Sequence, residues 1–162
     1  MRRTDRDITA DTARVTDILD RARVLRLALN DGPRPYIVPM HYGYTLENGT
    51  LTFWLHCAKE GHKLDLLRAD PNAAFELDCD IAPVSGGDVP CTYGSAYASV
   101  MGFGTAAVVD DPAEKIAALQ TLMHTQTGRE FVLTEQMAQS VCVLRLTVSE
   151  YTAKSRPLPK EV

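Results

Sequence analysis

An Asn-Gly pair between two strand-like runs is the feature that most constrains the fold of this 162-residue chain. Asn48-Gly49 follows an apolar-rich run at 35–44 and precedes a second run at 50–56. Asn-Gly readily adopts the positive φ angles of a two-residue turn, so the two runs are expected to pair as an antiparallel hairpin. We expect one strand over 35–44, in which Pro39 indicates a sheet edge, a bulge or a strand end.

The rest of the chain predicts more strands than helices. Alternating or apolar runs predict strands at 24–29, 73–81, 97–109 and 141–153, and helical spacing predicts helices near 9–22, 61–69, 112–123 and 133–139. Residues 82–93 are rich in Pro, Gly and Ser and are expected to form a loop. Because hairpins dominate, we predict a mainly β, α+β domain, with an antiparallel sheet closing into a small barrel.

Length, charge and cysteine spacing exclude several classes of protein. We expect a single domain over 1–154 and a flexible tail over 155–162. A net charge of -4 argues against a general nucleic-acid binder. No apolar run reaches the roughly 20 residues of a membrane span, and the first residues lack an apolar signal region, so a cytoplasmic protein is expected. The four cysteines show no Cys-x-x-Cys spacing, which disfavours a zinc or dithiol site.

Polar side chains gather between residues 55 and 63, where a predicted strand gives way to a predicted helix. A helix N-terminus offers unpaired backbone N–H groups and the positive end of the helix dipole, which suit a phosphate. Lys59 and Lys63 are four residues apart and would share one face of that helix. A phosphorylated cofactor is therefore predicted here, against the alternative of a solvated lysine face.

Two histidines are expected close to the same place. Counted from the Asn48-Gly49 turn, His41 and His56 are nearly equidistant, so they are expected to be cross-strand neighbours. With no third ligand evident, a metal site is disfavoured, and hydrogen bonding to a cofactor or small acid is favoured over it. A histidine satisfied by backbone groups remains an equal alternative. Cys57 is expected to be a passive wall residue.

Several segments, in this order and spacing, resemble the pyridoxamine 5′-phosphate oxidase-like flavin-binding proteins, and most closely the subgroup related to nitroimidazole resistance proteins. The segments that carry the resemblance are 36–44, 51–53, 56–64, 70–72, 97–104, 114–115 and 152–154. The resemblance implies an FMN-binding split β-barrel of Greek-key type that forms a homodimer, with two cofactor sites at the dimer interface. Deazaflavin, FAD and heme are the alternative cofactors that it allows.

The resemblance also implies roles for individual residues. One strand would line the isoalloxazine ring, largely through its backbone: Pro39, Met40, His41 and Tyr42. A second group would run beside the ring and the ribityl chain: His56, Cys57, Ala58 and Lys59. Lys63 would approach the phosphate, Ser99 would serve the site of the opposite subunit, and His56 takes the place of the suspected active-site histidine.

The implied function is an FMN-dependent oxidoreductase that moves hydride or electrons between the flavin and a small flat substrate, such as a nitroaromatic or quinone-like molecule. The alternative is a non-catalytic split barrel that holds flavin or heme for sensing or storage. The chain lacks the arginine pairs and the tryptophan-containing C-terminal ending of the better-known oxidases of this fold. Pyridoxamine phosphate itself is therefore not the expected substrate.

Overall fold

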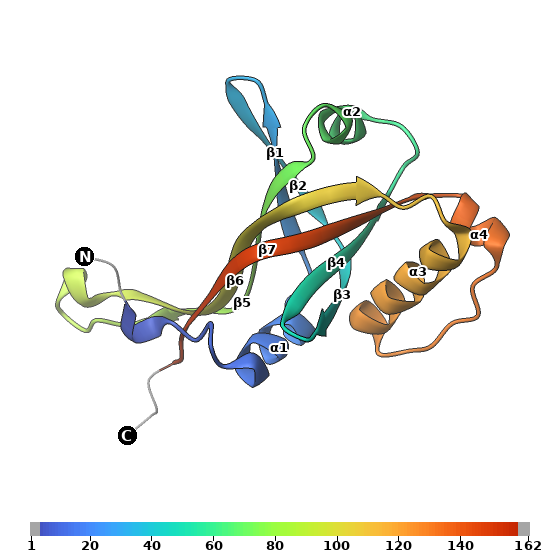
Figure 1. The fold of residues 1–162 in the computed structure, drawn as a ribbon. Coiled ribbons are helices and arrows are strands. Elements are labelled where there is room, and N and C mark those ends of the chain that lie inside the picture. The colour runs from blue at the N-terminus through green and yellow to red at the C-terminus, as the bar shows by residue number, and fades with distance from the viewer. Residues whose placement is uncertain (1–3, 159–162) are drawn as a thin grey trace.

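The structure, a computed structural model, describes residues 4–158 and consists of one antiparallel sheet with helices at its ends and on one side (Figure 1). The strands are β1 (Leu25–Asp31), β2 (Arg34–Met40), β3 (Tyr42–Glu47), β4 (Thr50–Cys57), β5 (Asn72–Val84), β6 (Gly94–Val108) and β7 (Cys142–Arg156). The α-helices are α1 (Thr12–Arg21), α2 (His62–Ala69), α3 (Pro112–Thr127) and α4 (Glu135–Gln139). Two short 3-10 helices are η1 (Thr4–Arg6) and η2 (Pro90–Thr92).

The order of the strands shows that the sheet must curl into a barrel. The order is β2-β1-β5-β6-β7-β4-β3, so β2 and β3 form the two edges. Only His41 separates the end of β2 from the start of β3 in the chain. Because one residue spans only about 3.5 Å, the two edges have to meet at this corner. The barrel is therefore closed at His41, and the predicted split-barrel fold is confirmed.

The inward-facing side chains of the strands fill the barrel. Phe53 is central, since its ring contacts Tyr42 edge-on at a centroid distance of 5.4 Å and Phe75 at 4.9 Å. The Tyr42 hydroxyl lies 2.7 Å from the Leu19 carbonyl and 3.1 Å from that of Ala22, to which it donates. Since both carbonyls belong to the C-terminal end of α1, this hydrogen bond fastens the helix across one end of the barrel.

Helix α3 packs on the outside of β3 and β4 (Figure 1). Its first turn is capped by Asp111, whose carboxylate accepts a hydrogen bond from the Glu114 amide at 2.8 Å. A close approach at Gly43 fixes its position, because a Cβ atom there would lie 2.7 Å from the Thr121 carbonyl carbon and closer still to the Leu122 backbone. None of the helices within residues 4–158 has the length and apolar character that a membrane crossing requires.

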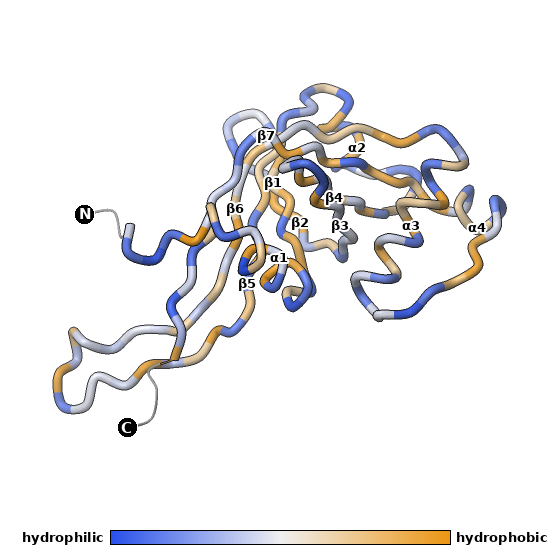
Figure 2. The backbone as a smooth tube through the Cα atoms, turned by 60° about the horizontal axis from the view of Figure 1, so that its bottom comes forward, coloured by the Kyte–Doolittle hydropathy of each residue, from blue (hydrophilic) through white to orange (hydrophobic). Residues whose placement is uncertain are grey.

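The distal parts of β5 and β6 form an arm that projects from the barrel (Figures 1 and 2). At the base of this arm the strand register shifts between Cys79 and Ala82. A second register shift, between β6 and β7, lies at Phe103 and Gly104. The sequence expectation of a loop over 82–93 is only partly correct, because β5 runs to Val84 and β6 begins at Gly94.

Two further boundaries differ from those predicted. Residues 35–44 do not form one strand, because the strand is interrupted at His41. The segments on either side of His41, β2 and β3, lie at opposite edges of the sheet. Ser155 and Arg156, expected in the tail, are paired with β6 opposite Ala98 and Tyr97. The remainder of the predicted tail, from residue 159 onward, lies outside the described residues. The Asn48-Gly49 turn is confirmed, with φ of 50° and 81°.

The contact between Gly43 and α3 generates a prediction. Gly43→Ala forces the helix away from β3, and we expect a loss of about 1–3 kcal/mol in the free energy of unfolding, measured by urea titration. Thr50→Ala, at the exposed start of β4, serves as the control and should change this free energy by less than about 0.5 kcal/mol. An equal stability of the two variants would contradict the close packing of α3 on Gly43.

Candidate functional site

The corner that closes the barrel brings the two predicted histidines together. Tyr42 pairs with Leu55 in the β3–β4 ladder, so continuing this register sets His41 opposite His56. Alternation along the strands points both imidazoles away from the barrel interior, since Tyr42 and Leu55 are buried and both histidines are exposed. The expectation that His41 and His56 are neighbours is confirmed by this register.

The surroundings of His56 favour its neutral form. Burial of part of the ring lowers the pKa of His56 below its ordinary value of 6.5, and the charges of His41 and Lys63 lower it further. His41 and Lys63 are thus close enough for their charges to act on His56. A neutral imidazole can accept a hydrogen bond at one ring nitrogen and donate one at the other.

Cys57 has the inert character expected of it. Its side chain is buried, and it pairs across the β4–β7 ladder with Cys142, which is also buried and free. Burial raises the pKa of the Cys57 thiol to about 11; the nearby Lys63 lowers it and Cys142 raises it. A raised pKa favours the protonated thiol, which is a poor nucleophile, and this suits the expected role of a passive wall residue.

The two predicted lysines lie where β4 leads into α2. Gly61 precedes this helix with a φ of 140° and a ψ of 161°, a conformation that is open almost only to glycine. No side chain caps this helix start, so backbone N–H groups of its first turn lack a side-chain acceptor. Lys63 is half-buried in the first turn, and Lys59 and Ala58 are exposed before it. The arrangement combines cationic and N–H donors in one place, which suits an anion.

The strand that was expected to line a cofactor ring divides between the inside and the outside of the barrel. Met40 and Tyr42 are buried in the core, whereas Pro39 and His41 are exposed. The Tyr42 carbonyl already accepts a hydrogen bond from Gln126 Nε2 at 2.7 Å. No local sequence pattern indicates this contact, because Gln126 comes from α3, more than 80 residues further along the chain.

Ser99 lies on β6, three strands away from the β2 end of the predicted site. Its neighbour Val100 pairs with Leu77, which pairs through Leu25 with Met40. Ser99 itself pairs with Lys154 on β7, whereas His56 pairs with Val143, eleven residues earlier on that strand. Ser99 shares instead the outer sheet face of Met101 and Phe103, because alternate residues of β6 point outward.

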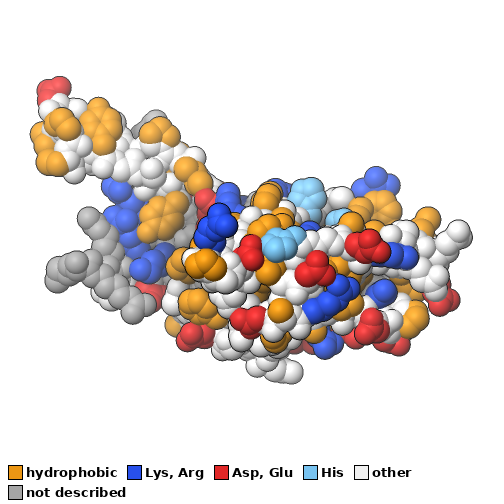
Figure 3. All heavy atoms as spheres, turned by 90° about the horizontal axis from the view of Figure 1, so that it is seen from above, with side chains coloured by type: hydrophobic (Ala, Val, Ile, Leu, Met, Phe, Trp, Pro, Cys, Tyr) orange, Lys and Arg blue, Asp and Glu red, His pale blue; other side chains and the backbone are white. Residues whose placement is uncertain are grey.

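The site is exposed on the single chain, since His41, His56 and Lys59 lie at the surface. Five of the hollows on the described surface are lined by other residues, and none of these five includes His41, His56, Lys59 or Lys63. In the space-filling view of Figure 3, histidine side chains are visible at the surface of the barrel. Within residues 4–158, no cluster of three or more His, Cys, Asp or Glu is arranged to hold a metal ion.

The fold agrees with the family that the sequence matches. A family model described as pyridoxamine 5′-phosphate oxidase matches residues 11–155. The chain therefore belongs to the pyridoxamine 5′-phosphate oxidase family, as the resemblance implied. No curated protein matches the chain.

Solved structures extend the comparison. A candidate 5-nitroimidazole antibiotic resistance protein from Bacteroides thetaiotaomicron is 28% identical with a TM-score of 0.75, over 89% of this chain and 83% of that one. An FAD and heme binding protein from Mycobacterium smegmatis is 20% identical with a TM-score of 0.77, over 97% and 77%. A flavocytochrome from Azotobacter vinelandii is 18% identical with a TM-score of 0.71, over 93% and 71%. At these lower identities, the last two comparisons show the shared fold alone.

The lowered pKa of His56 predicts a pH dependence of stability. As the pH falls through 6.5, the unfolded chain binds a proton at this residue before the folded chain does, so the free energy of unfolding falls. His56→Gln removes the titrating group, so this variant should lose less stability than the wild type when the pH is lowered from 7.5 to 5.5. Thermal melting at the two pH values measures the difference.

The control for this experiment is Thr105→Ala, which changes an exposed and non-titrating side chain on β6. It should keep the wild-type difference in melting temperature between the two pH values. If His56→Gln also keeps that difference, the preference of His56 for its neutral form is wrong.

Proposed function

We propose that the chain is an FMN-dependent oxidoreductase whose cofactor lies along the corner between β2, β3, β4 and α2. The observation that carries the proposal is the uncapped start of α2, with Lys63 in its first turn, close to the neutral His56. A flavin phosphate has about two negative charges, and cationic and backbone N–H donors together suit it. Membership of the family and the flavin-binding names among proteins of the same fold support the choice of a flavin.

The residues at this corner fit such a cofactor chemically. Lys63 and Lys59 would hold the phosphate, and the protonated Cys57 and exposed Ala58 would leave the neighbouring region free of charge. Pro39 and His41 present exposed surface to a ring, whereas Met40 and Tyr42 would act by fixing the backbone of the corner. Met40 and Tyr42 would thus orient the backbone around the cofactor without touching it through their side chains, which are buried in the barrel.

A bound flavin supplies hydride or electron transfer. His56 is the residue proposed to contact a substrate, since its neutral ring can donate to an oxygen of a nitro group, a quinone or a small acid. It can also hold a proton for transfer, with His41 beside it tuning the pKa. Reduction of a nitroaromatic or quinone-like substrate is the proposed reaction class, and the nitroimidazole resistance protein among the similar structures supports it.

The phosphate role of Lys63 is testable by binding. Lys63→Ala should weaken FMN binding by about tenfold or more, because a charge-assisted hydrogen bond is lost, while the fold persists. Quenching of flavin fluorescence during titration measures the affinity. Arg68→Ala removes a cation at the other end of the same helix, where it pairs with Asp65, and should leave the affinity unchanged. An unchanged FMN affinity of Lys63→Ala would contradict the assignment of Lys63 to the phosphate.

We also propose that the chain forms a homodimer that completes the cofactor site. The outer face of the sheet exposes Ile37 (61%), Met101 (54%) and Phe103 (58%), an apolar surface that favours a protein partner. Through the register, Ile37, Ala28, Ala74 and Phe103 form one row across four strands. Ile37, Pro39 and His41 are alternate, exposed positions that lead along β2 to the corner. A partner packed on this face would therefore reach the corner.

The position of Ser99 supports the same arrangement. It lies on that outer face beside Lys154, two residues before Met101. A second chain packed on the face would bring its own Ser99 toward the first chain's corner. The pairing would also cover the open site.

Charge on the apolar face should separate the dimer. Phe103→Glu places a carboxylate in the proposed interface, and we expect a monomer of normal circular dichroism by sedimentation at micromolar concentration. Val132→Glu is the matched control, because Val132 is 92% exposed and lies away from the sheet. This variant should keep the wild-type mass. A dimer that withstands Phe103→Glu would argue against this interface.

A heme-binding module is the second candidate function. The adjacent His41 and His56, one of them favouring the neutral form that binds iron, are the observation that supports it. A protein of the same fold is named for binding both FAD and heme. The absorbance spectrum of the purified protein separates the two candidates, since flavin gives bands near 375 and 450 nm and heme an intense Soret band.

A further inference from the structure

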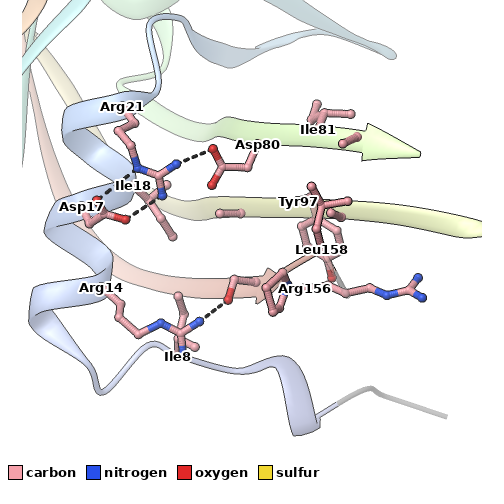
Figure 4. A pocket seen from close by; sticks show the side chains of 15 residues that line it. Ile8, Arg14, Asp17, Ile18, Arg21, Asp80, Ile81, Tyr97, Arg156 and Leu158 are labelled. Carbon is pink, nitrogen blue, oxygen red and sulfur yellow. Dashed lines mark hydrogen bonds and ion pairs between the residues drawn. The ribbon is translucent and has the colours of Figure 1, made fainter. Parts of the chain in front are cut away.

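A hollow of about 470 Å³ lies under α1 (Figure 4). It is formed by one face of α1, the ends of β5 and β7, and the start of β6. Its volume falls within the roughly 300–1,000 Å³ of small-molecule sites. Its lining includes none of the residues predicted for the corner site, so the hollow is distinct from that site.

The floor and one side of the hollow are apolar. Ile18, Ala96 and Ala98 are buried beneath it, with Ile18 and Ala98 also part of the wider packing between α1 and the sheet. Ile81 (66% exposed) and Leu158 (56% exposed) extend this apolar surface toward its mouth. Side chains of this kind favour the apolar body of a ligand over water.

One arginine of the hollow is fully engaged by carboxylates. Arg21 donates to Asp17 at 2.6 Å and to Asp80, so a single guanidinium bridges α1 and the end of β5 (Figure 4). The hydrogen bond from Arg21 holds the pKa of Asp17 below its usual value, which keeps this carboxylate charged. The cluster carries one net negative charge and holds the wall of the hollow in place.

Two other arginines line the hollow: Arg14, whose charge also acts on Asp17, and Arg156, whose guanidinium extends away from α1 in Figure 4. Arg14 donates to the Ser155 hydroxyl, and neither Arg14 nor Arg156 forms an ion pair with a carboxylate among residues 4–158. Figure 4 draws no interaction at the Arg156 guanidinium, and Figure 3 shows Lys and Arg side chains gathered at the base of the arm. A guanidinium offers a planar fork of N–H donors that matches a carboxylate.

We propose that this hollow binds a monocarboxylate with a flat apolar body. The carboxylate would accept from Arg14, with Arg156 at the rim as a second donor, and the body would lie over Ala96 and Ala98. Three arginines and two aspartates leave the lining with a single net positive charge, which matches one carboxylate. A phosphate monoester, with up to two charges, would be repelled by Asp17 and Asp80.

The probe for the experiment is 2-naphthoate, titrated by calorimetry into the full chain as purified. We expect binding that Arg14→Gln weakens by about tenfold or more, because a charge-assisted hydrogen bond is lost. Arg156→Gln should weaken binding by a smaller factor. Arg34→Gln, an exposed arginine at the start of β2, is the matched control and should bind 2-naphthoate as the wild type does.

A second measurement needs no variant, so the proposal stays testable if Arg14→Gln fails to fold. The wild-type chain should bind 2-naphthylmethanol, the uncharged analogue, about tenfold more weakly than 2-naphthoate. Equal affinity for the two probes, or no binding of 2-naphthoate at millimolar concentration, would overturn the proposal. So would loss of 2-naphthoate binding in Lys63→Ala or its displacement by FMN, since either result would assign the probe to the corner site.

Discussion

The one-residue connection at His41 is the constraint on which the rest of the structure depends. Because β2 and β3 are opposite edges of the sheet, a single residue between them forces the sheet to close. Closure turns Tyr42 into the barrel, where its hydroxyl holds α1 across the opening, and turns His41 outward beside His56. The same peptide segment thus shapes the core, seats a helix and begins the candidate site.

Local signals predicted most elements of the fold, and non-local pairing accounts for the errors. The Asn48-Gly49 turn was predictable because it depends on residues within a few positions of each other. The break at His41 was missed because strand-like character continues across residues 35–44 on both sides of it. Only the partner strands distinguish the two halves, and these come from distant parts of the chain.

The candidate site shows the same division. The neighbourhood of His41 and His56 follows from counting residues along one hairpin, so the sequence was sufficient to predict it. The hollow under α1 was missed, although Arg14, Asp17, Ile18 and Arg21 have the spacing of one helical face. That face was interpreted only through its buried apolar residues. Arg156 on β7 lines the same hollow but is more than 140 residues away from Arg14, so no local pattern joins the two.

The location of Ser99 on the outer sheet face, apart from Lys63 at the start of α2, has a genetic consequence if the proposed dimer shares its sites. In the proposed dimer, each site takes its lysine from one chain and its serine from the other. A chain defective at Lys63 and a chain defective at Ser99 would then form mixed dimers in which one site carries both defects and the other carries neither. Two inactive alleles would complement each other and restore one site in each mixed dimer, which a site built within a single chain would not allow.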